Sequence, residues 1–119
     1  MITYNPKVEK ESSIWNLSGD WTRDIPVSVR EEVSRALEGG ELPQLVDLTA
    51  VKFVDSWGER KIADLCQRMK SGTLVGSALI LTEVLQMELK LRMLKAVAKP
   101  WGKKMIAWEF SPDGSKSPN

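Results

Sequence analysis

The sequence predicts a single α/β (α+β) domain, built on one small mixed β-sheet of four to five strands with helices packed mainly on one face. Short β-branched or aromatic runs alternate with helical patterns along the chain, and this alternation favours an open sheet flanked by helices. A length of 119 residues allows one hydrophobic core but not two. We expect the domain to span residues 1–110, and the polar, proline-containing segment 111–119 to form a disordered tail.

The first half of the chain predicts two strands followed by a helix. Residues 2–10 have a strand pattern in which Pro6 favours an edge position. A second strand covers residues 14–17. After a loop, Pro26 suits the first turn of a helix, which Gly39-Gly40 then ends. The helix carries one apolar stripe, made of Val29, Val33, Ala36 and Leu37.

A third strand and a second helix meet at an Asp-Ser pair. The strand covers about residues 44–53, and Asp55 is a good N-cap for a helix from Ser56 to about Lys70. Ser71-Gly72 closes this helix. Its spacing puts four residues on one face, and these are Ile62, Leu65, Cys66 and Met69.

The last third of the chain predicts strand, helix and strand. Residues 73–81 are an apolar run of strand length, and residues 105–110 form a final strand. Between them, residues 85–96 alternate like a strand but consist of strong helix formers. We expect a helix there, with Thr82 as its cap and Pro100 as its stop. Its leucines and methionines exceed the needs of a surface helix, so they cover either the core alone, a partner or a second copy of the protein.

Composition narrows the function classes. The net charge is +1, from 17 basic and 16 acidic side chains, so no overall field attracts nucleic acid or anionic lipid. The chain begins without a signal-peptide pattern and contains no apolar stretch of membrane-spanning length. A single cysteine, Cys66, excludes an internal disulfide and fits a reducing compartment. We therefore expect a soluble cytoplasmic protein with no direct membrane insertion.

Catalytic groups are scarce. The chain contains no histidine, which removes histidine-based triads, most zinc sites and the commonest general base near neutral pH. Cys66 lies on an apolar helix face and is interpreted as a buried small residue. No glycine-rich phosphate loop is present. We expect a protein that is not an enzyme and that uses no cofactor or metal ion.

The most informative stretch is residues 45–58, where an apolar run reaches Asp55 and turns into a helix at Ser56. A hydroxyl at a helix N-terminus is well placed for phosphorylation, because free amides and the helix dipole favour negative charge there. Ser56 is thus the candidate phosphorylation site, with Asp55 orienting its hydroxyl. The alternative is that Ser56 only caps or lines the start of the helix.

Three features together resemble the STAS domain, a module of bacterial anti-sigma factor antagonists, sulphate transporters and lipid-transport accessory proteins. Residues 17–22 resemble the Gly-acidic-apolar turn of that family, after an early strand. Residues 46–56 resemble its signature Asp-Leu-Ser-x-Val-x-Phe-Ile-Asp-Ser. The helix expected over residues 56–70 has the family's length. The resemblance covers roughly residues 8–98 and implies a STAS-like fold.

The resemblance also implies a function in signalling and transcription regulation through protein–protein contact. In antagonists, the serine after the signature aspartate is phosphorylated by an anti-sigma kinase, and that serine corresponds to Ser56. The implied partner is an anti-sigma factor or serine kinase, not nucleic acid, and a homodimer is possible. The residues implied to bind the partner are Asp20, Trp21, Thr22, Asp55, Ser56, Trp57, Gly58 and Glu59.

The chain departs from the antagonist pattern after Ser56. Antagonists usually continue with Ser-Gly-Leu-Gly, whereas here bulky Trp57 follows and Glu59 replaces an apolar residue. Gly-Asp-Trp-Thr after an apolar strand also resembles STAS domains of lipid-transporting ABC systems. The alternative function is therefore an accessory protein that docks on a transporter ATPase or permease, with Trp57 and Trp21, on a loop of the same sheet end, as anchoring contacts. The other interpretation of these two tryptophans is partial burial in the core. The other tryptophans are expected in or over the core, and they are Trp15, Trp101 and Trp108.

Overall fold

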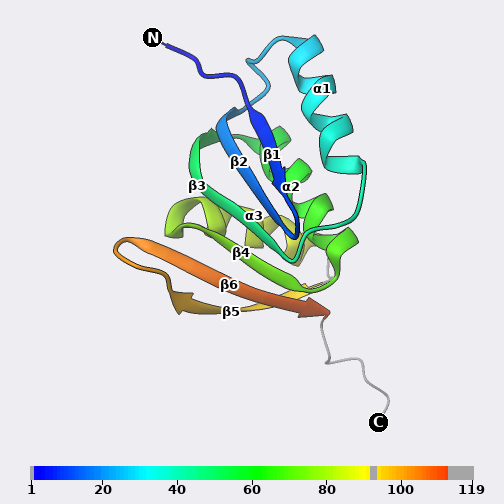
Figure 1. Cartoon of the computed structure of the whole chain (residues 1–119). Coiled ribbons are helices and arrows are strands. Elements are labelled where there is room, and N and C mark those ends of the chain that lie inside the picture. Colours follow the sequence, from blue (N-terminus) through cyan, green and yellow to red (C-terminus); the bar gives the residue numbers. More distant parts are fainter. Residues whose placement is uncertain (1, 92–93, 113–119) are drawn as a thin grey trace.

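The computed structural model describes residues 2–91 and 94–112. It contains one mixed sheet of six strands and three helices (Figure 1). The elements are β1 (Lys7–Glu11), β2 (Ile14–Trp21), α1 (Val27–Glu38), β3 (Leu45–Val54), α2 (Ser56–Met69), β4 (Gly72–Ser77), α3 (Ala78–Leu91), β5 (Leu94–Pro100) and β6 (Met105–Pro112). The predicted fold class is confirmed, with six strands in place of four to five.

The strands lie in the order β1-β2-β3-β4-β6-β5. The central strands β2, β3 and β4 are parallel, so their carboxyl ends meet at one edge of the sheet. On one side β1 pairs antiparallel with β2, and on the other β6 pairs antiparallel with both β4 and β5. The edge position expected for the first strand is confirmed, although that strand begins at Lys7 rather than at residue 2.

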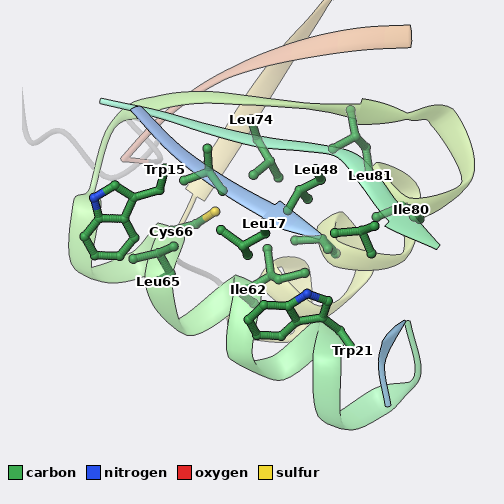
Figure 2. Close-up of a cluster of buried hydrophobic side chains, with 14 of the residues drawn as sticks. Trp15, Leu17, Trp21, Leu48, Ile62, Leu65, Cys66, Leu74, Ile80 and Leu81 are labelled. Atoms are coloured by element: carbon green, nitrogen blue, oxygen red, sulfur yellow. The ribbon is translucent and has the colours of Figure 1, made fainter. Parts of the chain in front are cut away.

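The hydrophobic core lies between the helices and one face of the sheet. The helix α1 packs against β1 and α2, α2 packs against β2 and β3, and α3 packs against β4, β5 and β6. Figure 2 shows the core side chains, with Trp15 and Trp21 at opposite ends of the cluster. The predicted apolar face of α2 is confirmed, since Ile62, Leu65 and Cys66 are fully buried there.

The segment between β4 and β6 differs from the prediction at both ends. The expected strand over residues 73–81 ends at Ser77, and α3 starts at Ala78 rather than after Thr82. The Ser77 hydroxyl accepts a hydrogen bond from the Ile80 amide at 3.3 Å, which helps to begin the helix early. The helix expected over residues 85–96 ends at Leu91, and β5 follows, because β6 offers it an antiparallel partner.

The strand β6 continues to Pro112, two residues into the expected tail, while residues 113–119 lie outside the described residues. Among the helices that the structure describes, none combines the length and the apolar character needed to cross a bilayer.

Candidate functional site

The candidate site is the β3–α2 corner, residues 53–59, at the carboxyl edge of the parallel strands. Asp55 has an extended backbone and stands between the last residue of β3 and the first residue of α2. Its Oδ1 accepts hydrogen bonds from the Trp57 amide at 2.9 Å and the Gly58 amide at 3.1 Å. These amides lack partners within the helix, so Asp55 satisfies them as an N-cap. The predicted cap is confirmed.

The second oxygen of Asp55 ties this corner to the loop that follows β2. Asp55 Oδ2 accepts a hydrogen bond from the Arg23 amide at 2.8 Å, and the Asp55 amide donates to the Trp21 carbonyl at 3.3 Å. One side chain thus receives three backbone amides from two separate segments. The arrangement fixes the start of α2 relative to β2.

Ser56 is the first residue of α2, and its side chain is exposed. Within the described part of the chain, its hydroxyl makes no hydrogen bond to another residue. Asp55 supplies the cap, so Ser56 does not cap the helix. Its place as the first residue of α2 fits both a phosphorylation site and the alternative in which Ser56 only lines the start of the helix. The hydroxyl is therefore accessible to another protein at a helix N-terminus.

Gly58 and Trp21 explain why the helix can begin so close to β2. Gly58 is buried, and a Cβ there would overlap the carbonyl oxygen of Trp21. Trp21 is fully buried, and its indole N–H donates to the Ser18 carbonyl at 2.9 Å. Trp21 is therefore the last residue of β2 and not an anchoring contact on a loop, and the interpretation as a core residue is confirmed for it. Its ring lies in the core beneath the corner, because the end of β2 directs it inward.

Trp57 lies over the buried ring of Trp21. Its half-buried ring stacks on Trp21, with the ring centroids 6.1 Å apart and the planes at 21°. The charged groups of Arg30 and Lys61 lie 5.8 Å and 5.9 Å from the centre of the Trp57 ring, within the range of cation–π attraction. A shallow cavity of about 500 Å³ opens beside it and is lined by Val27, Arg30, Glu31, Ser34, Arg35, Trp57 and Lys61.

Asp20 is buried and binds the backbone of the N-terminal segment. It is only 5% exposed, its Oδ2 accepts a hydrogen bond from the Tyr4 amide at 3.0 Å, and its own amide donates to the Tyr4 carbonyl at 2.9 Å. The preceding Gly19 has a φ of +88°, and a Cβ there would overlap the Asn5 carbonyl oxygen. Asp20 therefore holds the N-terminal segment against β2 and does not reach the surface as a partner contact.

The structure divides the predicted partner-binding residues into two groups. Asp20, Trp21 and Gly58 are buried and support the corner from behind. Those that reach the surface are Thr22, Asp55, Ser56, Trp57 and Glu59.

Sequence reasoning missed three side chains that shape this surface. Phe53 is 65% exposed at the end of β3, and alternation does not indicate this because the pattern of the strand breaks at Thr49 and Ala50, which are both exposed. Lys61 lies four residues after Trp57, a spacing that puts both on one helix face. Arg30 comes from α1, and no local signal connects it with Trp57.

Residues 2–91 and 94–112 contain no group of three or more acidic or cysteine side chains placed to hold a metal ion.

No protein-family model matches the chain, and no curated protein was found to be similar to it. The corner itself presents an exposed hydroxyl, two stacked aromatic rings and two basic side chains beside the outer ring.

Proposed function

We propose that this protein is a STAS-like interaction module, similar to anti-sigma factor antagonists, that acts in the cytoplasm and is switched by phosphorylation of Ser56. In this proposal the β3–α2 corner binds an anti-sigma factor or serine kinase. The observation that carries the proposal is the exposed Ser56 hydroxyl at the start of α2, in a corner that Asp55 holds in place.

The partner contact would centre on Trp57. A tryptophan supported from below by a second, buried tryptophan loses little conformational freedom on binding, and tryptophans are common interface hot spots. Arg30 and Lys61 beside the ring make the rim basic, which suits a partner surface that carries acidic side chains.

A phosphate on Ser56 would oppose such a partner. Phosphoserine adds roughly −1.5 to −2 charges, next to Asp55 and within three residues of Glu59. Because Asp55 already accepts the Trp57 and Gly58 amides, the phosphate competes with it for these donors. Displacement of Asp55 also weakens its bond to the Arg23 amide. Phosphorylation therefore acts twice: it repels an acidic partner, and it loosens the corner that holds Trp57.

The second candidate function is an accessory protein that docks, without phosphorylation, on the ATPase or permease of a lipid-transporting ABC system. One observation favours it: Asp55 occupies two of the amides that would otherwise stabilise a phosphate. Docking would use the same exposed residues, with Trp57 and Phe53 as the apolar contacts.

Two measurements test the proposal. Mass spectrometry of protein from its native cells should find a phosphate on Ser56. A partner recovered by pull-down from native lysate should bind the Ser56→Asp variant at least about tenfold more weakly, a change of about 1.4 kcal/mol. Ser56→Ala should bind normally, because the hydroxyl makes no hydrogen bond within the described residues and its removal leaves the corner intact.

Ser28→Asp is the matched control, since Ser28 is also exposed and lies in the first turn of α1. Equal binding by wild type and Ser56→Asp would contradict the switch and leave the docking function. Unchanged binding by Trp57→Ala would contradict both functions.

A further inference from the structure

The turn between β5 and β6, with its flanking residues, forms a second distinctive surface, which we call the hairpin tip (residues 99–105). Figure 1 shows it projecting beyond the neighbouring elements. The Trp101 amide donates to the Met105 carbonyl at 3.0 Å, and Gly102 and Lys104 have left-handed φ values of +64° and +66°. The Trp101 side chain is 47% exposed. The expectation that Trp101 covers the core is therefore wrong, because the tight turn directs this residue outward.

An apolar surface adjoins Trp101. A shallow hollow of about 510 Å³ lies between the base of the hairpin and the start of α3, and its lining is mainly apolar. It is lined by Ala78, Ala98, Lys99, Pro100, Lys104, Met105 and Ile106. Leu79, in the first turn of α3, follows Ala78 and is 70% exposed. Trp101 and Leu79 do not line the hollow, but each directly follows a lining residue, Pro100 or Ala78, and adds an exposed large apolar side chain to this part of the surface.

Positive charge lies on the hairpin side of this apolar surface. Lys99, Lys103 and Lys104 fall within six consecutive residues that contain no acid. Lys99 forms an ion pair with Glu109 at 2.9 Å. Lys103 and Lys104 are exposed and, within the described residues, form no ion pair. The whole chain has a net charge of only +1, so this is a local concentration of charge.

We propose that the hairpin tip adsorbs to the surface of an anionic lipid bilayer. Tryptophan is favoured at the boundary between headgroups and acyl chains, because its ring is apolar and its N–H is polar. Lysine stems extend along apolar surface while their ammonium groups reach anionic headgroups. Adsorption of this kind is peripheral and needs no membrane-spanning segment.

The residue types favour a bilayer over a protein partner. Tryptophan is enriched at both kinds of surface, but lysine is depleted in protein–protein interfaces. A specific small ligand would need several convergent polar groups in the hollow, whereas its polar side chains are the two lysines at its rim. Adsorption to an anionic bilayer requires an apolar surface and nearby positive charge, and the hairpin tip with its adjoining hollow has both.

The test is co-sedimentation of the full chain with vesicles of phosphatidylcholine mixed with phosphatidylglycerol, compared with vesicles of phosphatidylcholine alone. Wild type should bind the mixed vesicles and not the neutral ones. Removal of each lysine charge near an anionic surface should weaken binding about fivefold, so Lys103→Gln/Lys104→Gln should lose about twenty-five-fold. The control is Lys7→Gln/Lys52→Gln, a pair of exposed lysines that line one cavity beside Tyr4.

Tryptophan fluorescence gives an independent measurement. Mixed vesicles should shift the emission of wild type to shorter wavelength, and this shift should disappear in Trp101→Ala. The proposal is overturned by a lack of preference for anionic vesicles, by an equal loss in the control pair, or by an unchanged shift in Trp101→Ala. Binding of single-stranded DNA or an acidic peptide without binding of vesicles also overturns it.

Discussion

Replacement of Asp55 by alanine should destabilise the protein by about 2 kcal/mol. The side chain accepts three backbone amides, at 2.8, 2.9 and 3.1 Å. Loss of an N-cap costs about 1 kcal/mol. A hydrogen bond to a charged acceptor contributes about 1.5 kcal/mol or more when it is shielded from water. The bond from the Arg23 amide to Asp55 is exposed, so we expect it to contribute about 1 kcal/mol to the free energy of unfolding. The sum is a large part of the stability of a small domain, about 5–15 kcal/mol.

Urea unfolding, followed by circular dichroism, measures this loss. With a denaturant slope of about 2 kcal/mol per molar urea, the midpoint should fall by about 1 M while the slope stays constant. Asp55→Asn should lose less than half as much, because asparagine caps helices about as well as aspartate. Ser56→Ala should change stability by less than about 0.5 kcal/mol, since its side chain is exposed.

The comparison of these variants can refute the reasoning. If Asp55→Ala and Ser56→Ala lower the midpoint equally, the carboxylate does not hold the corner. If Asp55→Asn is as unstable as Asp55→Ala, the charge matters and the cap geometry does not.

Two further substitutions test the packing around α2. Gly58→Ala should destabilise the protein by about 2 kcal/mol or more, because the added Cβ overlaps the Trp21 carbonyl and the start of α2 must move. Thermal melting measures this loss, and an unchanged melting temperature would contradict the close approach. Ile62→Ala should cost about 3 kcal/mol in urea unfolding, because Ile62 is fully buried, whereas Leu79→Ala, at a residue 70% exposed, should stay within about 0.5 kcal/mol.

The β3–α2 corner was predictable because its main interactions are local in sequence. Asp55 caps amides two and three residues away, so its role follows from the residue type and the helical pattern after it. The apolar stripes of α1 and α2 were predictable for the same reason, since a helical period fixes which side chains share a face. These signals do not depend on the rest of the fold.

The region between β4 and β6 was harder because distant partners decide its structure. Residues 78–81 are all apolar, and so short an apolar run fits a buried helix as well as a buried strand. Residues 94–100 contain one β-branched residue, Val97, and become a strand because β6 supplies a ladder of hydrogen bonds. For β5 no strong local signal is present, whereas Ser77, whose hydroxyl accepts the Ile80 amide, is a local signal for the start of α3.

The tryptophans show the same limit within the candidate surfaces. Trp21 and Trp57 are both near the corner, but only the packing of α2 on β2 decides that Trp21 is buried and Trp57 half-exposed. Trp101 is exposed because the turn around it is tight and projects from the sheet. Sequence identifies such residues as important apolar groups, while the fold decides whether they face the core or a partner.

The two proposed surfaces lie at the same edge of the sheet. The parallel strands β3 and β4 end there, at Val54 and Ser77, and Ser77 pairs with Met105 at the base of the hairpin tip. A domain adsorbed through this tip would therefore turn its carboxyl edge, with the β3–α2 corner, toward the bilayer. That orientation suits a partner embedded in the membrane better than one free in solution. Binding of vesicles would thus favour the transporter-docking function over the phosphorylation switch, although both functions use the same exposed corner.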